Sequence, residues 1–380
     1  MDNITDPRNP VPTKGVPRLP TLKALTSVRF FAALHVAIYH LVRPFSLWGP
    51  LAPIMSAGYH GVSFFFFLSG FILTYSHVAE YELGRGSPTR FWIARVARIY
   101  PVYLLSMLFA GYVGFGLFRQ PIHVVAYIAD LLMIQSWSVR IVNFFHVTAW
   151  SVSVEMFFYF LFPFLLLRFR PATRARACLA VCGYWLLAMV PPLLCVVLYP
   201  KSALAEILFQ PVQVFRVYRL PILALPEFLA GVTLGWLYLR FPPAPALAKY
   251  LAPVGIIALT AALFQSPRLP NVMINNGLFI PLYSLIILGL CDRNWLSRAL
   301  SVSWLVLLGE ASYSLYLFHF LFNDWTVERF GAGSGLASAV WKLAVVIPIS
   351  VALHLFLERP ARRSILQWWS RRQASLRSTQ

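Results

Sequence analysis

Eleven long apolar segments, separated by short and mostly basic loops, constrain this sequence more than any other feature. They cover residues 27–45, 57–78, 93–118, 121–138, 148–167, 177–198, 222–239, 250–265, 273–290, 302–323 and 336–357. A helix needs about 20 apolar residues to cross the hydrocarbon core of a bilayer. Only 12% of the residues are charged, whereas soluble domains carry about 25%. The sequence therefore predicts an all-α, polytopic membrane helix bundle.

The placement of arginine predicts the topology, because cytoplasmic loops of membrane proteins carry an excess of Lys and Arg. The basic stretches are the N-terminal tail, residues 85–98, residues 168–176 and the C-terminal tail. If all four are cytoplasmic, segment 121–138 must have both of its ends outside. That segment also contains Asp130, so we expect it to be re-entrant or interfacial. About ten transmembrane helices remain, with both termini cytoplasmic.

Three regions follow from this pattern. Residues 1–24 are rich in proline and are expected to form a flexible cytoplasmic tail. Residues 25–358 form the transmembrane domain, and residues 359–380 form a basic cytoplasmic tail. The first apolar run lacks the design of a cleavable signal, so we expect it to be a retained membrane helix.

The strong basic charge points to lipid and not to nucleic acid. The formal net charge is +19, but the basic residues lie between apolar runs, where topology requires them. Since no basic stretch alternates with aromatic residues on a soluble module, nucleic-acid binding is not expected. Anionic membrane lipids are the expected partners of these residues. The four cysteines (Cys178, Cys182, Cys195 and Cys291) have no neighbouring metal ligands, so we expect them to be packing residues and predict no metal site.

Ionisable residues inside apolar runs are costly and are functional candidates by default. Arg29 and His40 are eleven residues apart, which places them on one helix face with a rise of about 16 Å. This geometry fits a long ligand with an anionic head; alternatively, Arg29 snorkels and His40 packs against a neighbouring helix. Arg95 and Arg98 lie on adjacent turns, where they could bind phosphates or simply set the topology.

Glu155 is a carboxylate in the apolar run that starts at Trp150. Such a group must be paired, hydrogen-bonded or protonated. The predicted topology puts it at the depth of His40, so it could orient that imidazole and raise its basicity. The alternative is a structural Glu155 that is bonded to Ser, Tyr or Trp. Weaker candidates, each expected to be structural, are Glu227, Glu310, His319 and Glu358.

Six motifs in a fixed order carry a family resemblance. They are Arg29 to His40, Gly61 to Ile72, Arg95 to Pro101, Trp150 to Tyr159, Ser312 to His319, and Glu358 to Pro360. With these motifs the chain resembles acyltransferase family 3, the integral-membrane O-acyltransferases, over nearly its whole length. Thr26 and Ser63 stand where the family usually has Asp. The chain looks like the stand-alone form, without a fused esterase-like domain.

The resemblance implies transfer of an acyl group, commonly acetyl from acetyl-CoA, to a hydroxyl of a saccharide or related acceptor. By this resemblance His40 is the catalytic histidine, and Arg29, Arg95 and Arg98 match the family's essential arginines. We place the CoA phosphates at these arginines and favour His40 as general base over a transient acyl-histidine. Glu155 is a further catalytic candidate.

The expected acceptor is a cell-surface or exported polysaccharide, or its lipid-linked precursor, at the bacterial inner membrane. A small-molecule natural product such as a macrolide is an alternative acceptor. A transporter or flippase is the alternative of another class, because it also places ionisable groups in the membrane. Inverted repeats with broken helices would favour a transporter, and the sequence shows no such pattern.

Overall fold

The computed structural model of the protein describes residues 19–42, 44–114, 116, 119–198, 219–331 and 335–378. Within these ranges the chain forms helices joined by turns and contains no strand, which confirms the predicted all-α class. The first helix, α1 (Lys23–Leu41), begins close to the expected start of the transmembrane domain. The predicted flexible tail lies largely outside the described residues.

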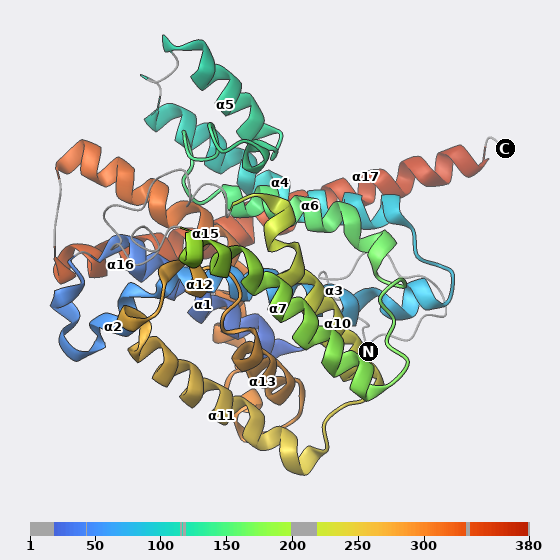
Figure 1. Ribbon diagram of the computed structural model, residues 1–380. Helices are drawn as coiled ribbons and strands as arrows, with labels where there is room; N and C mark the ends of the chain where they lie inside the picture. The colour runs from blue at the N-terminus through green and yellow to red at the C-terminus, as the bar shows by residue number, and fades with distance from the viewer. Residues whose placement is uncertain are drawn as a thin grey trace.

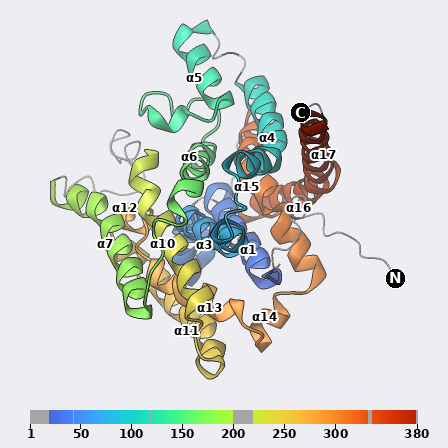
Figure 2. The same cartoon turned by 90° about the vertical axis from the view of Figure 1, so that its right-hand side faces the viewer.

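Two closely packed helix pairs form the centre of the bundle. They are α1 with α15 (Ser303–Phe330), and α3 (Gly61–Glu82) with α10 (Pro221–Arg240) (Figure 1). The other long or apolar helices surround them (Figure 2). These are α4 (Pro88–Val113), α6 (Trp150–Leu165), α7 (Arg174–Leu198), α11 (Pro245–Phe264), α13 (Ile280–Cys291) and α16 (Leu336–Leu353). Shorter helices in the connections are α2 (Ala52–Ser56), α12 (Asn271–Ile274) and α14 (Trp295–Ala299).

Glycines at both central contacts let the helix backbones approach closely, as is common in membrane bundles. A Cβ atom at Gly309 would overlap the carbonyl oxygen of Thr26, so α15 touches the backbone of α1 there. A Cβ atom at Gly231 would likewise overlap the carbonyl oxygen of Phe67, between α10 and α3. The α1–α15 contact matters most for function, because both helices carry candidate histidines.

Each of the eleven predicted apolar segments contains a helix. Among the described residues, eight helices are long and apolar enough to cross a membrane. The shorter apolar helices are α5 (Pro121–Leu131), α6 and α13. Ten spans were predicted; the eight long helices account for eight of them, and α6 and α13 stand where the other two were expected.

Helix α5 stands at the edge of the bundle (Figure 1). Its 11 residues give a length of about 16 Å, roughly half of the hydrocarbon core of about 30 Å. Turns and a short 3-10 helix (Gln135–Trp137) follow it up to α6. This length fits a segment that enters or lies on the membrane, although α13 at 12 residues is hardly longer.

Reporter fusions test the sidedness of this segment. Fusions placed after Arg119 and after Arg140 are both expected to report an extracytoplasmic location, because the arginine-rich loops on either side are expected in the cytoplasm. A fusion after Arg85, in the basic loop that precedes the segment, serves as the cytoplasmic control. Opposite locations for the first two fusions would show that 121–138 crosses the membrane and would reverse the predicted side of every later loop.

The C-terminal segment is helical. Helix α16 continues through a π-helical turn, His354–Glu358, into α17 (Arg359–Ser378), which extends away from the bundle (Figure 1). Where the sequence suggested only a basic tail, good helix formers such as Arg, Leu, Gln and Ala sustain the helix, and α17 packs against α4. Single π-helical turns inside α-helices frequently mark functional sites, and the residues of this one lie beside a cavity.

Candidate active site

An inner cavity lies between α1, α3, α4, α6 and α15. Its charged lining residues are Arg29, Arg95, Arg98 and Glu155. Hydroxyl groups supply most of the remaining polar lining, from Ser69, Ser151, Tyr159, Ser312, Tyr313 and Tyr316. Arg29 of α1 and the pair Arg95 and Arg98 of α4 therefore come together, and Glu155 of α6 joins them.

Glu155 is held by two hydroxyl groups. The Ser69 hydroxyl donates to its Oε1 atom at 2.8 Å, and the Tyr159 hydroxyl donates to the same oxygen. These bonds do not pair Glu155 with His40, as the depth estimate suggested. They match the alternative, in which Ser and Tyr side chains hydrogen-bond to the carboxylate. Whether Glu155 also acts in catalysis stays a prediction.

The guanidinium group of Arg95 lies against aromatic rings in this cavity. It stacks over the rings of Phe91 and Tyr159, 5.7 and 5.9 Å from their centroids. Its buried Nε atom has no hydrogen-bond acceptor among the described residues. Because a buried donor without an acceptor costs free energy, an anionic ligand group is a partner that suits the chemistry of Arg95.

A second cavity adjoins the first, and we call it the mouth cavity. The two share Arg29, Arg95 and Arg98 in their walls. The mouth cavity adds three arginines of α17, namely Arg359, Arg362 and Arg363, together with Glu310 and His354. Six arginines thus line one cavity, a concentration of positive charge that favours a ligand with several phosphate groups.

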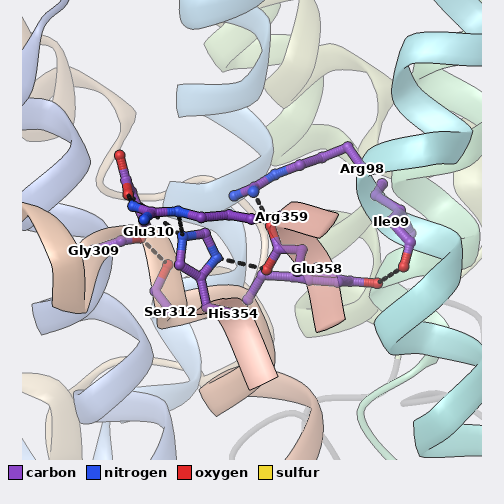
Figure 3. A network of polar contacts seen from close by, with 9 residues as sticks. Arg98, Ile99, Gly309, Glu310, Ser312, His354, Glu358 and Arg359 are labelled. Carbon is purple, nitrogen blue, oxygen red and sulfur yellow. Dashed lines mark hydrogen bonds and ion pairs between the residues drawn. The ribbon is translucent and has the colours of Figure 1, made fainter. Parts of the chain in front are cut away.

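A polar network fixes the wall of the mouth cavity (Figure 3). Glu358, which is fully buried, forms an ion pair with Arg98 and accepts a hydrogen bond from Nδ1 of His354 at 2.9 Å. The Nε atom of Arg359 donates to Nε2 of His354 at 3.0 Å, and Arg359 also pairs with Glu310. The π-helical turn therefore holds Arg98 of α4 and Arg359 of α17 in fixed positions beside the cavity.

His40 pairs with a second histidine. Its Nδ1 atom lies 3.0 Å from Nε2 of His319, and Nδ1 of His319 lies 3.2 Å from the carbonyl oxygen of Leu315. A carbonyl oxygen only accepts, so Nδ1 of His319 carries the proton and its Nε2 atom accepts. When both rings are neutral, His40 must donate through Nδ1, and its basic atom is Nε2.

The histidine pair lies one layer of side chains beyond the inner cavity. Neither His40 nor His319 is in the described lining of the two cavities. Tyr316, which lines the inner cavity, has its ring centroid 5.9 Å from that of His319. The Tyr316 hydroxyl shares a 2.8 Å hydrogen bond with Ser151. Tyr316 therefore links the wall of the inner cavity to His319.

Other polar candidates have their own partners elsewhere. Ser63 donates a hydrogen bond to the buried carboxyl group of Glu227 in the α3–α10 interface. The serine at this position therefore satisfies a buried acidic side chain. A ring nitrogen of His35 lies 3.2 Å from His60, and the other lies 2.8 Å from the carbonyl oxygen of Ile54, so His35 does not take part in the His40–His319 pair. Within the described ranges, no group of three metal-ligating side chains gathers.

Sequence reasoning missed the three arginines of α17 and the pairing role of His319. Arg359, Arg362 and Arg363 have the spacing i, i+3, i+4 of one helix face, which could have marked them as a binding face. From the sequence, Arg359 is used only as part of the motif Glu358 to Pro360, and Arg362 and Arg363 are assigned only to a basic tail. His319 was noted as a weak candidate, but its partner on another helix could not be inferred from spacing.

These features agree with the comparisons with known proteins. The family model described as acyltransferase domain matches residues 22–358, and the chain belongs to this family, acyltransferase family 3. The protein is therefore a membrane acyltransferase of the O-acetyltransferase type.

Named relatives match most of this chain. The chain is 29% identical to acyltransferase MdmB of Streptomyces mycarofaciens, over 91% of this chain and 93% of that protein. It is 30% identical to exopolysaccharide production protein ExoZ of Rhizobium meliloti (strain 1021), over 80% and 90%. It is 25% identical to SAR0937 of Staphylococcus aureus (strain MRSA252), provisionally named an O-acetyltransferase, and spans 61% of that protein. No solved structure matches the chain significantly.

Proposed function

We propose that the protein transfers an acetyl group from acetyl-CoA to a hydroxyl of a saccharide acceptor. The observation that carries this proposal is the order of the site: a mouth cavity with six arginines, an inner cavity that shares three of them, and a histidine pair behind Tyr316. CoA has the same order, with phosphates at one end and the thioester at the other. Its diphosphate would lie at Arg29, Arg95 and Arg98.

The reaction needs one base and one path for a proton. The acceptor oxygen attacks the carbonyl carbon of the thioester while Nε2 of His40 removes the hydroxyl proton. The C–S bond then breaks, the sulfur takes the proton from the imidazolium of His40, and the products are the ester and CoA. His319 holds the neutral His40 ring in the tautomer that leaves the lone pair on Nε2.

For the acetyl group to reach His40, the side chain of Tyr316 must turn or the acyl end must pass beside it. Glu155 is proposed to steady the arginine-lined wall through Ser69 and Tyr159, and it remains a candidate for direct action on the acceptor. For the acceptor, the name of ExoZ supports an exported polysaccharide or its lipid-linked precursor. A bacterial inner membrane is the location that this acceptor implies.

Arg95 gives the sharpest test of the donor site. Arg98 is less suitable, because its removal would leave the buried Glu358 carboxylate without its ion pair. A charge-assisted contact contributes about 1.5–3 kcal/mol, so Arg95→Ala should weaken CoA binding to the purified protein roughly ten- to a hundredfold. Arg95→Lys should recover part of the affinity, because it keeps the charge but loses the planar fork.

Isothermal titration calorimetry in detergent measures these affinities. Arg174→Ala is the matched control, since it removes an exposed arginine from the start of α7, away from both cavities. CoA affinity that is the same in Arg95→Ala and the wild type would remove Arg95 from the donor site. A wild type that binds no CoA would refute the proposed donor.

A further inference from the structure

The arginines of α17 occupy a different part of the site from those of α1 and α4. Arg29, Arg95 and Arg98 line both cavities, whereas Arg359, Arg362 and Arg363 line the mouth cavity alone. The α17 group therefore lies on the side of the shared arginines that is away from the inner cavity. When a long ligand extends from the mouth cavity into the inner cavity, the end that remains in the mouth cavity lies beside the α17 arginines.

The three α17 arginines differ in their surroundings. Arg359 is engaged by Glu310 and His354, which anchors the first turn of the helix. Arg362 is buried in the wall, and Arg363 is exposed. Arg362 and Arg363 follow Arg359 by three and four residues. This spacing places all three side chains on the helix face that lines the cavity. The anchored turn thus presents two further guanidinium groups at the mouth.

The chemical structure of CoA offers a phosphate group that could bind to Arg362 and Arg363. In CoA the diphosphate lies between the pantetheine arm and the adenosine, and a phosphate monoester is attached to the ribose 3′ oxygen. If the thioester points inward and the diphosphate meets the shared arginines, the 3′-phosphate lies on the outer side. That phosphate carries up to two negative charges and accepts bidentate bonds from guanidinium groups.

We propose that Arg362 and Arg363 bind the 3′-phosphate of the CoA donor, so that the enzyme distinguishes CoA from 3′-dephospho-CoA. This inference rests on the proposed function. It adds a subsite on the C-terminal helix and a selectivity that the shared arginines alone would not give. The π-helical turn contributes by fixing the start of α17 through the bonds of His354 and Arg359.

Calorimetric titration of the purified full-length protein with CoA and with 3′-dephospho-CoA tests the subsite. The wild type is expected to bind CoA roughly ten- to a hundredfold more tightly. In the double variant Arg362→Gln/Arg363→Gln this preference should fall to about twofold or less. The loss should come from weaker CoA binding, with the affinity for 3′-dephospho-CoA nearly unchanged. Glutamine keeps the helix propensity while it removes the charge.

The double variant Arg371→Gln/Arg372→Gln is the matched control. It removes the same charge from exposed positions of the same helix, so it should retain the preference of the wild type. The single variant Arg363→Gln replaces only an exposed side chain, so it should fold even if the double variant does not. It should lose a measurable part of the preference for CoA.

Three results would overturn the inference. These are equal wild-type affinity for the two ligands, a preference that survives in Arg362→Gln/Arg363→Gln, and a loss of preference that is as large in the control. Each of them leaves the proposed donor intact, because CoA still binds. A wild type that binds neither ligand would instead refute the donor itself, and the subsite with it.

Discussion

We expect the His40→Ala protein to insert and fold like the wild type but to transfer acetyl groups about 10²–10⁴-fold more slowly. This range is the usual contribution of a positioned general base or acid, and His40 is the histidine whose basic Nε2 atom the pairing with His319 defines. The measurement is the incorporation of radiolabelled acetyl from acetyl-CoA into saccharide material. It uses membranes of a deletion strain that carries each variant at matched expression.

The control for this variant is His35→Gln on the same helix. His35 is hydrogen-bonded to His60 and to Ile54, so its replacement affects packing without affecting the His40–His319 pair. Its transfer rate per folded molecule should stay within about threefold of the wild type. A His40→Ala protein with the wild-type rate would show that another group removes the proton.

Replacement of His319 separates a positioning role from a packing role. His319→Phe fills similar space but offers no acceptor to Nδ1 of His40, so the ring can adopt either tautomer. We expect kcat to fall about a hundredfold, with a smaller change in KM for acetyl-CoA. In His319→Gln the side-chain oxygen can accept the same hydrogen bond, and it should recover at least about tenfold of that loss.

The pH profile of kcat gives a readout that packing alone would not move. In His319→Phe the apparent pKa of the catalytic base should differ from that of the wild type, because the hydrogen bond to Nδ1 is lost. The shift should be smaller in His319→Gln. If both variants have the wild-type profile and the same reduced rate, His319 would be a packing residue and the tautomer argument would be wrong.

The sequence predicted the helix class and much of the inner cavity because spacing within a helix determines which residues share a face. Arg95 and Arg98, three residues apart, both line the inner cavity, and Arg29 joins them from α1. These predictions needed only the helical repeat and the rarity of charge in apolar segments. Each apolar run contains a long or apolar helix in the predicted order, whereas α17 and the short helices α2, α12 and α14 were not predicted.

The partners across helices could not be predicted in the same way. A depth estimate placed Glu155 level with His40, but it carried no information on which helix faces meet. In the structure Ser69 and Tyr159 hold Glu155, and His319 holds His40. The mouth cavity depends on a π-helical turn, His354–Glu358, for which no sequence signal was apparent. Arg362 and Arg363, which α17 adds to this cavity, are therefore assigned by the sequence only to a basic tail.

A structure of the protein with a thioether analogue of acetyl-CoA, determined by electron cryo-microscopy, tests the central claim most directly. The account predicts that the diphosphate contacts Arg29, Arg95 and Arg98 and that the carbonyl of the acyl group lies within hydrogen-bond reach of Nε2 of His40. The side chain of Tyr316 should have moved to admit the acyl end. An analogue bound with its phosphates away from these arginines, or with its acyl end far from His40 at full occupancy, would contradict the account.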